Sequence, residues 1–309
     1  VNNWLKIGGD MQFVNKDITR SNWDNGNVDY QILAIYGAAP NYTPTMTLPD
    51  GTTGYVARYS SAIGEWTVRN PDAQDVSGSL TDERINVIPQ FYAEVKLFKD
   101  LTWFTKGAVT LDEGKTKNHE HAVDNYFFKD GTYAHNNSTW KLGVRDTWTS
   151  NSFSTFYSTL NYKKIFGTHS INVLAGYNQE SNNYKELRGN RIDFPTIDLK
   201  ELNAGSAEGQ TNYGTANEWA IQSFFGRAAY NFNERYLFEV NARYDGTSRI
   251  APDTRWGFFP SISGAWRISE EAFAQNIGWL DNLKLRASWG QLGNQNVGLY
   301  PYQEVLSTT

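Results

Sequence analysis

Apolar and polar residues alternate with a period of two along many segments of this chain, and this pattern constrains the fold more than any other feature. Residues 84–98 show it most clearly: the odd-numbered positions from Ile85 to Leu97 are apolar, while Arg84, Glu94 and Lys96 occupy even-numbered positions. An extended strand places every second side chain on the same face, which a helix cannot do. Aromatic residues make up 15% of the chain and many follow the apolar positions. An aromatic-rich apolar face opposite a polar face is typical of strands that separate lipid from water.

The alternation predicts an all-β, antiparallel fold with nine strands. They are expected over residues 4–14, 84–98, 101–112, 139–163, 168–181, 218–232, 236–246, 255–268 and 282–290. Segment 139–163 is interpreted as one long strand, because its apolar residues remain even-numbered throughout. Short connections then alternate with long ones, and the longest fall at 15–83, 113–138 and 182–217. Short turns at one end and long loops at the other are typical of transmembrane β-barrels, so we predict a segment of such a barrel.

Composition excludes several classes of protein. No stretch of about 18 apolar residues is present, which excludes a helical membrane protein. The mean hydropathy of −0.58 is compatible with a transmembrane barrel and equally with a soluble β-protein. The absence of cysteine excludes disulfides, and a net charge of −5 without a basic run argues against a nucleic-acid partner. No signal peptide is visible at the start, so we expect either a soluble protein or part of a longer one.

Strand parity divides the candidate functional residues between two faces. The charged residues expected to line a lumen or to face a plug inside it are Arg84, Glu94, Lys96, Lys106, Glu239, Arg243, Asp245, Arg255, Arg267, Lys284 and Arg286. The aromatic residues expected to face lipid are Trp103, Trp140, Trp256, Trp266 and Trp289. Sugars are bound by aromatic rings together with hydrogen-bonding side chains. The candidate substrate-binding residues are therefore aromatic residues of the longest loop, namely Trp23, Tyr42, Tyr55, Tyr59 and Trp66.

The sequence gives only weak support for catalytic or metal-binding residues. Adjacent carboxylates at 112–113 and 270–271 could serve glycoside hydrolysis, but neighbouring residues of a strand point to opposite faces. His119 and His121 would share a strand face, yet two ligands leave a metal site incomplete. The acidic segment 24–29 lacks the spacing of a calcium loop. We therefore predict no enzymatic activity, no bound metal and no cofactor.

Five long segments closely resemble the SusC/RagA family of TonB-linked outer-membrane transporters. They are Leu160–Glu180, Phe194–Ala207, Glu218–Arg249, Arg243–Glu271 and Leu283–Tyr302, in the order that the family has them. The resemblance implies that residues 1–309 are part of a barrel of 22 strands with a plugged lumen. It also implies that the signal peptide, the N-terminal extension, the plug and the last strands lie outside this sequence.

The resemblance further implies a function and a location. The protein would import oligosaccharides, or peptides, across the bacterial outer membrane. A SusD-like surface lipoprotein would close over it, and TonB would supply energy through the missing N-terminal part. Two alternatives remain open: a siderophore-type TonB receptor without that lipoprotein, and a soluble carbohydrate-binding β-protein whose aromatic face packs in a core.

Overall fold

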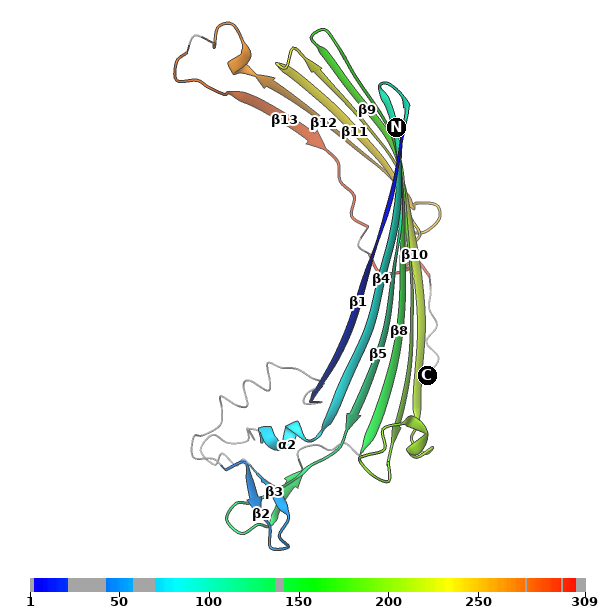
Figure 1. The fold of residues 1–309 in the computed structure, drawn as a ribbon, viewed down its shortest axis with the longest axis vertical. Helices are drawn as coiled ribbons and strands as arrows, with labels where there is room; N and C mark the ends of the chain where they lie inside the picture. The colour runs from blue at the N-terminus through cyan, green and yellow to red at the C-terminus, as the bar shows by residue number, and fades with distance from the viewer. Residues whose placement is uncertain are drawn as a thin grey trace.

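Nine antiparallel strands form one curved sheet in which each strand pairs with the next one along the chain (Figure 1). The computed structural model describes residues 3–21, 43–57, 70–136, 142–275, 277–295 and 297–303. The strands are β1 (Leu5–Ser21), β4 (Gly78–Phe98), β5 (Leu101–Glu120), β8 (Gly143–Phe166), β9 (His169–Ile192), β10 (Thr211–Phe232), β11 (Tyr236–Thr247), β12 (Trp256–Arg267) and β13 (Lys284–Gly290). The all-β prediction with nine strands is confirmed, including the single long strand that is now β8.

Most of the strands are longer than predicted, and the additions lie mainly at the end with the long loops. β4 begins six residues earlier than expected, at Gly78, and β10 begins seven residues earlier, at Thr211. Most of the added residues are polar and their few apolar members do not alternate regularly, so hydrophobic alternation could not reveal them, although they remain paired to their neighbours. β8 has 24 residues and is therefore roughly 80 Å long. A tilted strand crosses a membrane in roughly 9–11 residues, so the strands extend well beyond one.

Short turns make three of the four connections between the described strands at the other end of the sheet, and the fourth, between β12 and β13, spans residues 268–283. Two residues connect β4 to β5 and two connect β8 to β9, while residues 233–235 connect β10 to β11. Gly167, Asn233 and Glu234 have left-handed backbone angles, with φ of 58°, 51° and 54°. Left-handed residues in a tight hairpin match the right-handed twist of the strands that they join.

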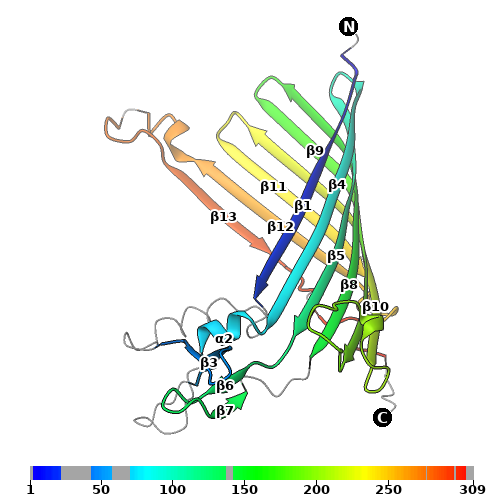
Figure 2. The ribbon, with the colours of Figure 1, turned by 60° about the horizontal axis from the view of Figure 1, so that its bottom comes forward.

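A small second sheet lies at the long-loop end, beside the short helix α2 (Pro71–Asp75), as Figure 2 shows. Its strands are β2 (Thr45–Thr47), β3 (Thr53–Val56), β6 (Asp124–Tyr126) and β7 (Tyr133–Asn136). Val56, Ala73 and Val123 are buried in this region. The long predicted loops 15–83 and 113–138 therefore contain strands of their own. In the part of the chain that the structure describes, no helix is long and apolar enough to cross a membrane.

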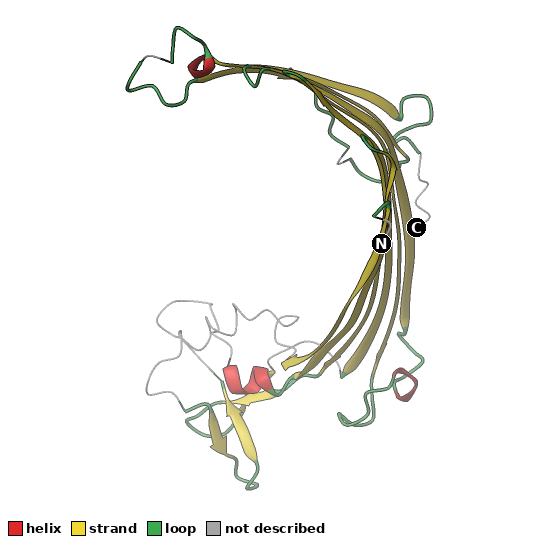
Figure 3. Cartoon of the chain, turned by 45° about the horizontal axis from the view of Figure 1, so that its top comes forward, coloured by secondary structure: helices red, strands yellow, loops and turns green. Residues whose placement is uncertain are grey.

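The curvature of the large sheet distinguishes its two faces (Figure 3). The rings of Tyr157 on β8 and Phe225 on β10 approach to 5.8 Å between centroids, although β9 lies between their strands. The backbones of strands two apart are separated by roughly 9.6 Å. These side chains therefore converge, as they do on a concave face. The register places them on the same face as the predicted lumen charges, so this polar face is concave.

The convex face carries a continuous band of exposed apolar residues, which we name the apolar belt. Its exposed members include Ile7, Met11, Phe13, Phe91, Trp103, Phe156, Leu160, Val173, Phe224, Phe238, Tyr244, Phe258, Ile262, Leu285 and Trp289. The register aligns them in rows across the strands: Phe224, for example, lies between Tyr177 on β9 and Tyr244 on β11. Phe91 is 70% exposed. An exposed apolar surface of this extent suits contact with lipid.

Candidate functional site on the concave face

The concave face gathers the charged residues that alternation assigned to a lumen. Arg84, Glu94, Lys96, Lys106, Glu239, Arg243, Asp245, Arg267, Lys284 and Arg286 occupy the concave-face positions of β4, β5, β11, β12 and β13. Arg255 directly precedes β12 and continues the same parity. The contact of these residues with a plug or a cargo stays a prediction.

Several of these charges pair with a carboxylate on the same face. Arg84 lies 3.3 Å from Asp82, and the Nε of Arg243 donates to both carboxylate oxygens of Asp245, at 2.7 and 2.8 Å. Arg243 also donates to the hydroxyl of the buried Ser223 at 2.8 Å. Both arginine side chains are more than 40% exposed. Such pairs contribute little to stability, so their main effect is to fix the direction of the guanidinium groups.

Four aromatic side chains form a row across the middle of the concave face, which we name the aromatic row. Tyr92 on β4 lies 6.1 Å from Phe104 on β5, and Phe104 lies 6.2 Å from Tyr157 on β8. Phe225 on β10 completes the row at 5.8 Å from Tyr157. Sequence parity alone does not single out these rings, because the row depends on which strands are neighbours.

A glycine leaves space for one ring of the aromatic row, and a cation lies at each end of the row. Gly176 on β9 lies beneath Phe225, and a Cβ atom at Gly176 would lie 2.3 Å from the ring. The absence of a side chain there lets Phe225 lean across β9. At the two ends of the row, Lys6 lies 5.8 Å from the ring centre of Tyr92 and Arg243 lies 5.7 Å from that of Phe225. Cations at this distance are attracted to aromatic faces.

Further aromatic residues and arginines meet nearer the long-loop end of the concave face. The guanidinium of Arg249 lies 4.5 Å from the ring of Trp219, and that of Arg188 lies 5.5 Å from Tyr213. Arg188 also pairs with Glu186 at 2.7 Å. Strand alternation does not predict the contact of Arg249 with Trp219, because Arg249 lies in the loop between β11 and β12 and its position depends on the path of that loop.

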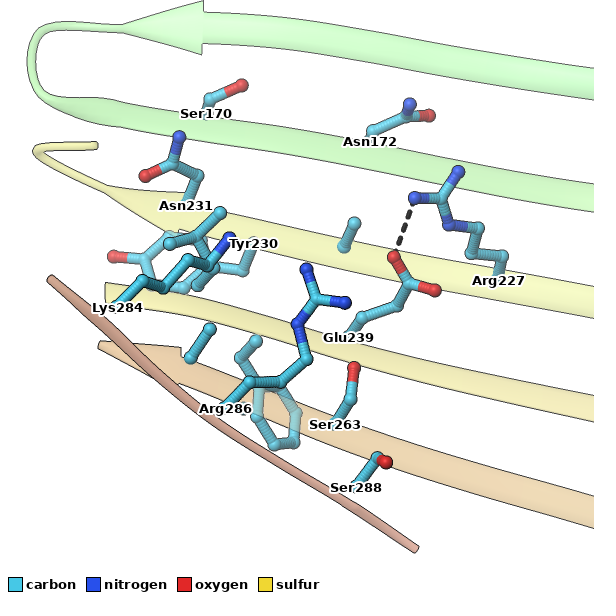
Figure 4. A pocket seen from close by; sticks show the side chains of 15 residues that line it. Ser170, Asn172, Arg227, Tyr230, Asn231, Glu239, Ser263, Lys284, Arg286 and Ser288 are labelled. Atoms are coloured by element: carbon cyan, nitrogen blue, oxygen red, sulfur yellow. Dashed lines mark hydrogen bonds and ion pairs between the residues drawn. The ribbon is translucent and has the colours of Figure 1, made fainter. Parts of the chain in front are cut away.

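A cavity of about 460 Å³ lies on the concave face near the short turns (Figure 4). Strands β9 to β13 all contribute to it, and its charged residues are Arg227, Glu239, Lys284 and Arg286. Arg227 donates to Glu239 at 2.6 Å. We name this cavity the cationic pocket. Three of its charged residues were predicted to line a lumen, whereas Arg227 was not selected and is found by its position beside Glu239.

Of the predicted substrate-binding aromatics, Tyr55 lies within the described residues. Tyr55 lies in β3, where it is partly buried and pairs with Thr45 and Asn125. Trp23, Tyr42, Tyr59 and Trp66 lie outside the described residues, and so does Trp140 of the predicted lipid-facing set. The other four members of that set, Trp103, Trp256, Trp266 and Trp289, occupy convex-face positions. Sugar binding by the loop aromatics stays a prediction.

The carboxylate pairs considered for catalysis are held in structural contacts. Asp112 and Glu113 lie on opposite faces, and Glu113 accepts a hydrogen bond from Ser150 at 2.6 Å. Glu271 accepts from the Tyr236 hydroxyl at 2.5 Å and from the Trp266 indole at 3.0 Å. These two hydrogen bonds hold the pKa of Glu271 below its usual range. Glu271 therefore fixes two convex-face aromatics at the short-turn end, beside the apolar belt.

His119 and His121 lie together beyond the apolar belt, with ring centroids 6.0 Å apart. Burial lowers the pKa of His119 to about 4, aided by the positive charges of Lys200 and Lys117, and burial also lowers the pKa of His121. Among the described residues, no group of three or more His, Asp or Glu side chains could hold a metal ion. The neutral pair is thus packed within the long-loop end of the protein.

Comparisons with known proteins agree with this architecture. The family model described as "TonB dependent receptor-like, beta-barrel" matches residues 11–306. The TonB-dependent receptor SusC of Bacteroides thetaiotaomicron is 37% identical over 140 residues, which cover 44% of this chain and 13% of SusC. A TonB-dependent receptor of Formosa agariphila is 34% identical over 152 residues, which cover 47% of this chain and 15% of that receptor.

Solved structures support the same fold. The structure of the RagAB peptide transporter superposes with a TM-score of 0.75 at 19% identity, covering 99% of this chain and 33% of the matched chain. The RagAB peptide importer in its "open-open" state gives a TM-score of 0.76, again at 19% identity, covering 99% of this chain and 32% of that one. At this identity the match establishes the fold alone. The chain therefore spans about a third of the solved relatives, and its matches to the two curated relatives span 13% and 15% of their lengths.

Proposed function

The chain belongs to the family of TonB-dependent receptor-like β-barrels, and from this premise we propose that it forms part of the wall of a nutrient importer. Its location is the bacterial outer membrane. The complete protein imports oligosaccharides, with peptides as the second class of cargo. It works with a SusD-like surface lipoprotein and draws its energy from TonB. It has no catalytic activity.

One observation carries this proposal: a single curved sheet has an apolar belt on its convex face and charged, amide and aromatic side chains on its concave face. A strand that separates lipid from an aqueous lumen needs this division, because lipid excludes charge while water and polar cargo favour it. The concave face also offers rings beside arginines, which suits hydroxyl-rich cargo that hydrogen-bonds and packs at once.

The remaining barrel strands and the plug belong, in this proposal, to parts of the protein beyond residues 1–309. Two facts support it. The sheet ends at β1 and β13 without returning to itself, and the chain matches about a third of each RagAB structure. Open sheet edges within lipid leave backbone groups without hydrogen-bond partners, so further strands must pair with them.

The two alternative functions differ from this proposal in the partner, the growth phenotype or the burial of the apolar belt that they predict. A siderophore-type receptor would share the barrel but act without a surface lipoprotein, and its loss would matter under iron limitation. A soluble carbohydrate-binding protein would bury the apolar belt in a core. Within the part of the chain that the structure describes, Phe91, Phe224 and Phe258 of the belt are each more than half exposed, which argues against the soluble alternative.

The test is deletion of the gene in its native bacterium, followed by growth on individual oligosaccharides, on peptides and under iron limitation. A strain lacking TonB function provides the control for energy coupling. We expect slower growth on one group of oligosaccharides in both strains, and recovery of a lipoprotein with the tagged transporter from outer membranes. A defect confined to iron limitation, without a lipoprotein, would replace this proposal with the siderophore alternative.

A further inference from the structure

A second cavity, of about 500 Å³, lies on the convex face at the long-loop end, and we name it the outer pocket. Strands β4, β5, β8, β9 and β10 contribute to it, and so does the short helix η2 (Leu202–Ala204) in the loop between β9 and β10. Figure 3 shows this loop on the outer side of the curved sheet, away from the lumen. Each of the five strands pairs with a neighbour on both sides within the chain, so the cavity does not border an open edge. Its volume is within the range of sites that enclose small ligands, roughly 300–1,000 Å³.

Polar and apolar contacts hold the loop against the sheet. The Nζ of Lys117 on β5 donates to the carbonyl of Lys200 at 2.8 Å and lies 3.1 Å from the carboxylate of Glu201. A Cβ atom at Gly189 on β9 would lie 2.9 Å from the side chain of Leu202. The absence of a side chain at residue 189 therefore lets Leu202 approach the sheet, and the loop forms one wall of the outer pocket.

The floor of the outer pocket is apolar but separate from the apolar belt. Trp148 and Leu187 face each other across the β8–β9 ladder, and they are 38% and 60% exposed. Serines occupy the three convex-face positions between Trp148 and Phe156 of the belt. Trp148 precedes Phe156 by eight residues, which corresponds to roughly 26 Å along the strand. The floor therefore lies beyond the part of the sheet that faces hydrocarbon.

The charged side chains on the convex face of the pocket balance one another. They are Glu83, Lys115, Lys117 and Asp146, and Lys117 lies 3.5 Å from Asp146. The remaining charged lining residue, Arg188, belongs to the concave face by register. Glu83 and Lys115 are partners in the β4–β5 register, and within the described structure neither forms an ion pair. A carboxylate and an ammonium group are thus free to form hydrogen bonds beside the apolar floor.

This combination favours a saccharide as the ligand. An exposed indole packs against the apolar face of a sugar ring, while carboxylate, ammonium and amide groups bond to its hydroxyls. Asn212 supplies an amide to the lining. An acyl chain or a protein partner needs an apolar surface that continues beyond one pocket, whereas Glu113, Ser150 and Lys185 border this one on the side of the belt. The balance of charge suits a ligand without net charge.

We propose that the outer pocket binds a neutral saccharide at the cell surface, with one sugar ring stacked on Trp148. Glu83, Lys115 and Asn212 form hydrogen bonds with the hydroxyls of that ring and its neighbour. The site goes beyond the proposed importer, because it lies outside the lumen and binding there requires no transport. The saccharide has two possible sources, a free oligosaccharide and the sugar chain of lipopolysaccharide in the surrounding outer leaflet.

Isothermal titration of the purified, complete transporter in detergent tests the inference and separates the two sources. The probes for a free oligosaccharide are maltotriose, cellotriose and mannotriose. The probe for the membrane source is the sugar chain of lipopolysaccharide from the native bacterium, freed of its lipid. We expect at least one probe to bind the parent, and to bind Trp148→Ala about ten-fold or more weakly. The affinity for a neutral trisaccharide should change little as salt is raised, because no charge pair forms on binding.

A matched pair of double substitutions tests the polar side of the pocket. Glu83→Gln with Lys115→Gln should lower the affinity by about three-fold or more. Glu113→Gln with Lys185→Gln makes the same change of charge one row nearer the apolar belt, outside the pocket, and should leave the affinity unchanged. All variants must reach the outer membrane in amounts like the parent, which establishes that they fold.

The inference is overturned if no probe binds, if Trp148→Ala binds every probe as the parent does, or if the control pair loses as much affinity as the pocket pair. A probe that binds within the lumen gives the second of these results, since Trp148 faces outward. The growth test of the proposed function is independent of this one. Import can fail in the deletion strain while the outer pocket binds its saccharide, and the pocket can fail while import stands.

Discussion

At the scale of single residues, Gly176 and Phe225 show how one absent side chain shapes the concave face. The ring of Phe225 occupies the space above β9 where a Cβ atom of residue 176 would lie. Its centroid is therefore only 5.8 Å from that of the Tyr157 ring. The aromatic row therefore crosses a strand that contributes no ring to it. Alternation cannot predict this, because the row depends on contact between strands two apart.

Substitution of Gly176 by alanine should destabilise the barrel by about 1–3 kcal/mol, since the new Cβ would overlap the Phe225 ring and force it away from Tyr157. The matched control is Gly107→Ala on β5, where nothing lies within 4 Å of the added atom. That change should be neutral or slightly stabilising. Unfolding of each purified variant by denaturant measures the difference, and equal stabilities would show that the ring moves freely.

The buried histidines give a second prediction at this scale, on pH. Burial holds the folded-state pKa of His119 near 4, below the ordinary value of 6.5. Between these values the unfolded segment binds more protons than the folded one. The contribution of His119 is therefore complete above about pH 6.5 and is lost as pH falls toward 4. The loss is on the order of 2–3 kcal/mol, and the lowered pKa of His121 adds to it in the same direction.

Amide hydrogen exchange of residues 118–126 at pH 7 and at pH 4.5, corrected for intrinsic rates, measures this loss. Protection should decrease at the lower pH in the parent and decrease less in His119→Gln, which cannot gain the proton. An equal decrease in both proteins would assign the effect to other groups.

At the scale of elements, the sequence predicts the strands in which apolar and polar residues alternate, and few others. β11 was located to within one residue and the C-terminal end of β4 was located correctly, because both contrast apolar with charged positions there. The ends of β5 and β9 were missed because most of their residues beyond the apolar belt are polar, so the contrast between the two faces is lost there. The short strands β2, β3, β6 and β7 were missed for a related reason: three or four residues are too few to show a period. The concave-face charges followed from parity, whereas the cationic pocket required knowledge of which strands are neighbours.

The environments of the two faces can be compared by introducing an arginine on each and measuring the loss of stability. Ala228 on β10 lies in the apolar belt between Val173 and Val240, and Ala108 on β5 lies on the concave face between Gln90 and Thr155. Ala228→Arg should cost about 2–4 kcal/mol, because an arginine near the centre of the bilayer loses its hydration. Ala108→Arg places the same side chain toward water and should cost far less. Unfolding in lipid vesicles distinguishes them, and similar costs would contradict the assignment of the faces.

At the scale of the whole molecule, the two edges of the sheet decide what it can do alone. β1 presents 17 residues and β13 presents seven, and in the described structure each pairs on one side only. Every backbone group left without a partner in lipid costs several kcal/mol, so an open sheet of this width cannot persist in a membrane. Only when the sheet closes into a barrel can the apolar belt face lipid while the concave face encloses an aqueous lumen.

Residues 1–309 produced alone and refolded in detergent should therefore assemble through these edges rather than remain single. Light scattering coupled to size exclusion should give protein masses that are multiples of 35.1 kDa, while the complete chain should give one monomeric barrel. Proline substitutions at Met11 and Phe13, within β1, provide the control, since they remove donors from that edge and should reduce assembly. A folded, monodisperse particle of 35.1 kDa would contradict the argument, because it would mean that these nine strands satisfy their own edges.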